Sequence, residues 1–79
     1  MNTQAQIIYN LLCKLDEKYF TPEKIRPAIL EGNITKQTEI ELVDSLCQTV
    51  ITSLNFGDYK RAVKYLALAE GLCKKFFAA

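Results

Sequence analysis

The sequence predicts an all-α fold: a small antiparallel bundle of three long helices plus one short helix, forming one domain over residues 1–79. Two observations predict it. Apolar residues recur at steps of three and four along most of the chain, which is the spacing that places them on one face of a helix. Glycine, proline and asparagine interrupt this spacing at only a few points, and short connections favour antiparallel neighbouring helices.

The first helix is expected over about residues 3–19. Its apolar stripe is formed by Ala5, Ile8, Leu12, Leu15 and Tyr19. Two further apolar residues widen this stripe, and polar residues take the opposite side of the helix. The pattern is that of an amphipathic helix with one buried face.

The second helix is expected to be short and to begin at Thr21-Pro22-Glu23. A hydroxyl residue can cap the first turn, proline fits there without loss of a hydrogen bond, and an acid is favourable near the positive end of the helix dipole. Gly32-Asn33 predicts its end. Pro27 lies where a helix interior needs an N–H, so the sequence leaves open whether residues 22–31 form a regular helix.

The third helix is expected to begin near Thr35 or Thr38, and Thr38-Glu39-Ile40-Glu41 fits a capping box. Asn55-Phe56-Gly57-Asp58 then predicts a tight turn, in which glycine supplies the unusual backbone angle and Asp58 caps the next helix. The last helix is expected over about residues 59–77.

The segment from Gly57 to Ala69 resembles the turn and second helix of a tetratricopeptide repeat. The family pattern is matched by a turn glycine, an aromatic residue, two small residues and a large apolar one, at Gly57, Tyr59, Ala62, Ala69 and Leu66. The preceding helix departs from the pattern of the family's first helix. The resemblance implies a tight antiparallel helix hairpin, in which small residues let the two helices approach closely.

Composition predicts no catalytic, cofactor-binding or metal site, and no enzyme. The chain has no histidine, so a serine or cysteine nucleophile lacks its usual base. Its three cysteines, Cys13, Cys47 and Cys73, cannot supply the four ligands of a structural zinc site, and each fits a small buried hydrophobe. No phosphate-binding glycine loop is present. Free cysteines without an export signal favour a cytoplasmic location.

These features predict a non-enzymatic protein–protein interaction module, such as a small helical adaptor, chaperone or regulator, that binds through its last two helices. The last helix carries more apolar residues than one buried stripe can hold, which is typical of an interface. The partner is expected to be another protein or a second copy of the chain. The expected partner-binding residues join this apolar surplus to a basic cluster: Lys60, Arg61, Lys64, Tyr65, Leu68, Leu72, Phe76 and Phe77.

Two alternatives remain open. The chain is similar in size, helix count and late turn to the small four-helix immunity proteins that protect bacteriocin producers, which would make it an immunity- or antitoxin-type protein. A nucleic-acid-binding regulator would use residues 58–79, whose five basic and two acidic residues give a net charge of +3. The whole chain has a net charge of only +1, which disfavours nucleic acid, and no apolar stretch is long enough for a membrane span.

Overall fold

A computed structural model describes residues 3–77, and the regular secondary structure within them is entirely helical, so the predicted all-α class is confirmed. The helices are α1 (Thr3–Tyr19), α2 (Pro22–Leu30), α3 (Ile34–Asn55) and α4 (Tyr59–Phe77). They form an elongated body of 41 × 18 × 17 Å. Within residues 3–77, no helix combines the length and the apolar character that crossing a membrane requires.

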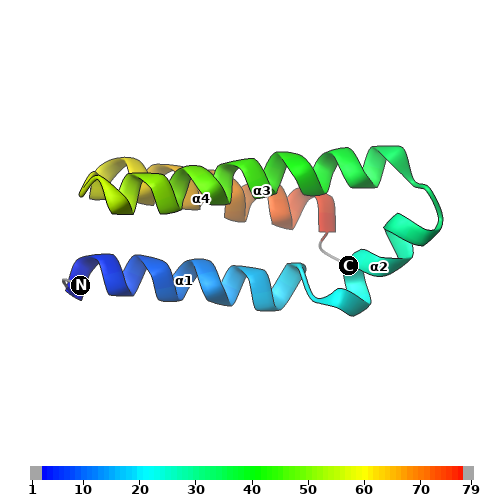
Figure 1. The fold of residues 1–79 in the computed structure, drawn as a ribbon, viewed down its shortest axis with the longest axis horizontal. Helices are drawn as coiled ribbons and strands as arrows, with labels where there is room; N and C mark the ends of the chain where they lie inside the picture. Colours follow the sequence, from blue (N-terminus) through cyan, green and yellow to red (C-terminus); the bar gives the residue numbers. More distant parts are fainter. Residues whose placement is uncertain (1–2, 78–79) are drawn as a thin grey trace.

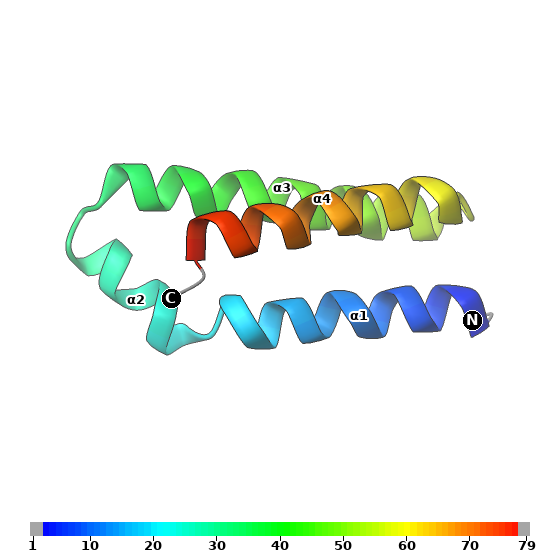
Figure 2. The same ribbon diagram turned by 180° about the vertical axis from the view of Figure 1, so that it is seen from behind.

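The three longer helices lie side by side, and α2 crosses one end of the molecule (Figures 1 and 2). α3 and α4 run antiparallel and make the most extensive helix–helix contact. α1 lies alongside this hairpin, parallel to α4 and antiparallel to α3. α2 therefore lies at the end of the molecule where α1 ends and α3 begins.

The hydrophobic core lies between α1 and the α3–α4 hairpin. Each long helix contributes one stripe of residues at steps of three and four, as periodicity requires. All five residues predicted for the stripe of α1 are buried. The largest core cluster comprises Ile8, Leu12, Leu15, Tyr19, Val43, Cys47, Val50, Ala62, Leu66, Ala69 and Cys73. Because two of the four α4 members are alanines, α4 can approach its neighbours closely along this stripe.

The turns on either side of α3 have the same construction. Gly32 and Gly57 have φ angles of 65° and 73°, in the left-handed region that favours glycine. The residue after each glycine donates its N–H to a carbonyl five residues back, Asn33 to Ala28 (3.0 Å) and Asp58 to Ser53 (2.9 Å). This is the Schellman pattern, which satisfies carbonyls that the helix end leaves without partners.

The residue that follows each glycine also caps the next helix. Asp58 Oδ1 accepts the Arg61 N–H at 3.1 Å, which confirms the expected cap of α4. Asn33 Oδ1 accepts the Lys36 N–H at 3.0 Å, so α3 is capped by Asn33 rather than by Thr35 or Thr38. The predicted capping box at Thr38 is wrong, because that residue lies inside the helix and its hydroxyl donates to Ile34 O at 2.9 Å.

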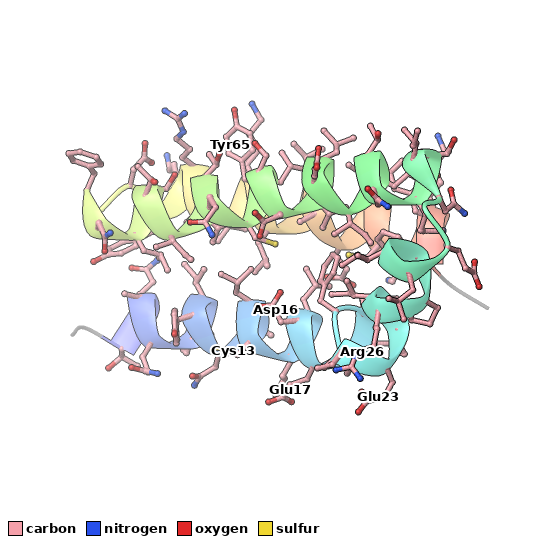
Figure 3. All side chains as sticks on the ribbon, turned by 45° about the vertical axis from the view of Figure 1, so that its right-hand side comes forward. Cys13, Asp16, Glu17, Glu23, Arg26 and Tyr65 are labelled. Carbon is pink, nitrogen blue, oxygen red and sulfur yellow. The ribbon has the colours of Figure 1, made fainter. Side chains whose placement is uncertain are left out.

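Residues 22–30 form a helix despite Pro27, which settles the question left open by the sequence. Thr21 holds the N-cap position and Pro22 the first turn, as predicted, but the Thr21 hydroxyl makes no capping hydrogen bond. Pro27 removes only the bond that its own N–H would have made to the carbonyl of Glu23, and Glu23 is an exposed residue. Glu23 and Arg26 point away from the other helices (Figure 3).

Candidate functional site

The side of the α3–α4 hairpin that faces away from α1 carries most of the predicted partner-binding residues, and we call it the outer face. The flanks that face α1 are marked by two grooves. Leu66 and Glu70 of α4 line a groove with Leu11, and Cys47 of α3 lines another with Asp16. Helical spacing places the opposite flanks on the outer face, and they carry Leu42, Leu46, Thr49, Arg61, Tyr65, Leu68, Leu72 and Phe76.

The outer face is an apolar band that water reaches. Leu42 on α3 and Leu68 on α4 each expose 48% of their surface. Leu46, Tyr65 and Leu72 are half-buried and pack against the core from this side. Tyr65 projects from the side of the hairpin opposite α1 (Figure 3). Exposed and half-buried apolar side chains of two neighbouring helices therefore lie on the same side of the hairpin.

A cluster of cations lies at the hairpin end of the outer face. The Arg61 guanidinium is 5.4 Å from the centre of the Tyr65 ring, and the Lys64 ammonium is 5.9 Å from it. Both distances suit cation–π attraction. Arg61 also lines a shallow hollow with Phe56, which exposes 85% of its surface. The sequence patterns did not single out Phe56, although its position in a turn made exposure predictable.

The structure does not bring all eight predicted residues together. Lys60, Arg61 and Lys64 are exposed at one end of α4, whereas Phe77 lies at the other end and on a different side. The Phe77 ring meets the Phe20 ring edge-on, with centroids 5.6 Å apart. The Lys36 ammonium lies 4.7 Å from the centre of the Phe77 ring, and Phe77 thus packs against residues of the α2 end of the molecule.

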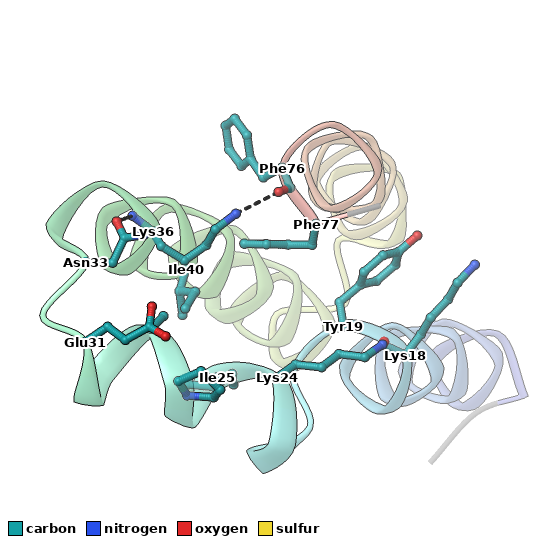
Figure 4. A pocket seen from close by; sticks show the side chains of 12 residues that line it. Lys18, Tyr19, Lys24, Ile25, Glu31, Asn33, Lys36, Ile40, Phe76 and Phe77 are labelled. Atoms are coloured by element: carbon teal, nitrogen blue, oxygen red, sulfur yellow. Dashed lines mark hydrogen bonds between the residues drawn. The ribbon is translucent and has the colours of Figure 1, made fainter. Parts of the chain in front are cut away.

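A pocket of about 640 Å³ lies at that end, beneath α2, and the sequence patterns did not reveal it. All four helices contribute to its walls, including Tyr19 of α1, Ile25 of α2, Ile40 of α3 and Phe77 of α4 (Figure 4). Three lysines of three different helices also line it, Lys18, Lys24 and Lys36. No local pattern could group these lysines, because only the crossing of α2 brings them to one place.

The chemistry of the cysteines is that of buried thiols. Cys47 and Cys73 are buried in the core, and Cys13 is half-buried on α1. Burial, and then the negative charge of Asp16, raise the pKa of Cys47 to about 12 and that of Cys73 to about 11. Both thiols are therefore protonated and poor nucleophiles at neutral pH. Among residues 3–77, no three cysteine or carboxylate side chains are grouped so that they could hold a metal ion.

These pKa values predict which thiols react in the native protein. At pH 9 we expect a thiol reagent to label the half-buried Cys13 quickly, and to label Cys47 and Cys73, whose pKa values are raised by burial, at least tenfold more slowly. Labelling would be followed by mass spectrometry, with denatured protein as the reference in which all three react. A Cys13→Ser variant should lose the fast phase. A fast phase that persists in this variant would contradict the burial of the other two thiols.

Comparison with protein-family models, with curated proteins and with solved structures gives no match for this chain. Two surface features of the described residues are candidate sites, the outer face and the pocket beneath α2.

Proposed function

We propose that the protein is a non-enzymatic interaction module whose outer face binds an amphipathic helix of another protein. The observation that carries the proposal is the alignment of Leu42 and Leu68, each 48% exposed, with the half-buried apolar residues between them. Two parallel rows of side chains on adjacent helices offer a surface of the kind that a partner helix fills with its own apolar face. Aromatic and arginine side chains at such surfaces commonly contribute much of the binding energy.

The charges at the hairpin end support an acidic partner. Lys60, Arg61 and Lys64 lie within two turns of α4, and acids beyond Asp58 are absent from this stretch of the sequence. A partner helix with acidic residues beside its apolar stripe would pair with these cations and would be held in one orientation. The segment Gly57–Ala69, which resembles part of a tetratricopeptide hairpin, has its two small residues Ala62 and Ala69 fully buried. Burial of these small residues lets α4 pack closely.

The test uses two variants of α4 that introduce the same carboxylate on opposite flanks of the helix. Leu68→Glu places a carboxylate on the outer face, and Val63→Glu places the same group on the opposite flank, at a residue that is 52% exposed. The tagged wild-type protein and both variants would be used to capture partners from native lysate. We expect a partner that the wild-type protein and Val63→Glu retain and that Leu68→Glu loses, with a fall in affinity of at least about tenfold.

The affinity of the isolated partner would then be measured at low and high salt, and circular dichroism would show that both variants are folded. The outer face would be excluded as the binding surface if both variants lost the partner equally, or if both retained it. Recovery of only untagged copies of the chain would replace the helical partner with self-association. Capture of nucleic acid that salt releases steeply would favour the nucleic-acid alternative instead.

A further inference from the structure

The pocket beneath α2 is separate from the outer face and has a different chemical character. Its volume of about 640 Å³ falls in the range of small-molecule sites. The rings of Tyr19 and Phe77 and the aliphatic side chains of Ile25 and Ile40 face its interior (Figure 4). An apolar group placed among these side chains would be removed from water, which favours binding in proportion to the area covered.

Contacts between the helices fix the walls of the pocket in position. Lys24 Nζ donates to the carbonyl of Lys18 and ties α2 to the end of α1. Gln37 Nε2 donates to Ala28 O at 3.3 Å and ties the other end of α2 to α3. The Phe77 ring packs edge-on against the Phe20 ring. Because α2 is fixed at both ends, the pocket is formed before any ligand enters it, which lowers the entropic cost of binding.

The charged residues of the pocket favour an anion. Among residues 3–77, three lysines (Lys18, Lys24 and Lys36) and one acid (Glu31) line it, which gives this part of the lining a net charge of +2. Glu39 lies 3.3 Å from Lys36 Nζ, and including it leaves a net charge of +1. An ammonium group has three donors. The Lys24 ammonium donates to the carbonyl of Lys18, which positions it without cancelling its charge. The Lys36 ammonium donates to Phe76 O at 2.8 Å and also pairs with the Glu39 carboxylate.

We propose that this pocket binds an amphiphilic anion, a small molecule with one carboxylate or phosphate head group on an aliphatic body. The body lies against Tyr19, Ile25, Ile40 and Phe77, and the head group accepts a charge-assisted hydrogen bond from Lys24, while the charges of Lys18 and Lys36 add to the attraction. Charge-assisted hydrogen bonds of this kind are the stronger ones. Neither part suffices alone, because a free carboxylate remains hydrated and a neutral alkyl chain leaves the lysines unused.

The experiment compares five probes on the wild-type protein by titration calorimetry. Decanoate and decyl phosphate carry both parts, decanol and decyltrimethylammonium lack the anionic head, and acetate lacks the body. We expect at least one of the two anionic amphiphiles to bind at least tenfold more tightly than the other three probes, and the tighter one identifies the head group. Equal binding of decanol would overturn the proposal, as would absence of binding by both anionic probes.

Matched variants locate the site. Lys24→Gln combined with Lys36→Gln removes two charges from the pocket, and Lys14→Gln combined with Lys74→Gln removes the same charge from residues that do not line it. We expect the first pair to weaken binding about tenfold and the second to leave it unchanged. If the first pair fails to fold, amide chemical shifts of the wild-type protein decide. Shifts confined to Ile25, Ile40 and Phe77 would support the pocket, and shifts at Leu68 would overturn it.

Discussion

Replacing Leu12 with alanine should lower the free energy of unfolding by about 2–5 kcal/mol, whereas the same change at Leu11 should cost less than about 1 kcal/mol. Leu12 is 3% exposed in the core of α1, and Leu11, the next residue, is 48% exposed. Removing the Leu12 side chain leaves a cavity that α3 and α4 cannot fill without moving. A domain of this size has a total stability of only about 4–12 kcal/mol, so the first variant should be close to unfolding at ambient temperature.

The comparison would be made by urea unfolding followed by circular dichroism, with equal slopes required before the midpoints are compared. Because the two leucines are adjacent in one helix, helix propensity changes equally in both variants and cancels in the difference. Equal midpoints would mean that α1 does not use its Leu12 face to pack against the hairpin.

Ala69→Leu is expected to destabilise the protein by about 1–3 kcal/mol, because its added side chain has no space. Ala69 has no exposed surface and belongs to the core stripe of α4, in the same cluster as Val43, Cys47 and Val50 of α3. Three additional carbons at this point must push α4 away from its neighbours or force side chains out of favourable rotamers. The small residue is therefore part of what allows the α3–α4 hairpin to close.

Ala67→Leu is the control, since Ala67 is exposed on the same helix and the substitution is identical. It should change stability by no more than about 0.5 kcal/mol. Thermal unfolding of both variants, with the wild-type protein alongside, measures the difference. A stabilising effect of Ala69→Leu would show that the core has an unfilled space at this position and that the helices are not in close contact there.

The helices were predictable because their stripes repeat over many turns. All five stripe residues of α1 are buried, and Gly57 and Asp58 end one helix and cap the next as expected. The start of α3 was left open between Thr35 and Thr38, and it lies next to the first of these, at Ile34. The capping residue was not identified because Asn33, Thr35 and Thr38 are all acceptable caps, and only the Schellman turn at Gly32 selects Asn33. Local sequence offers such choices, and the geometry of the preceding turn decides among them.

The candidate sites were less predictable for a physical reason. Tyr65 and Leu68 were identified from the apolar surplus of one helix, which is a local property. Leu42 was not, because its partner row on α4 becomes its neighbour only after α3 and α4 pack. The pocket beneath α2 depends on the angle at which a nine-residue helix crosses the others. That angle depends on contacts between elements, such as Gln37 with Ala28 and the sequence-distant pair Phe20 and Phe77, which helical periodicity does not predict.

The position of α1 beside α4 has a consequence for the order of folding. α3 and α4 are joined by a turn of three residues and can meet at little cost in loop-closure entropy, whereas the contact between α1 and α4 closes a much longer loop. We therefore expect the hairpin to nucleate folding and α1 to join last. Until α1 docks, its uncovered stripe of Ile8, Leu12 and Leu15 can pack equally well against the hairpin of another molecule. The short link at Phe20-Thr21 would then act as the hinge for exchange of α1 between two chains.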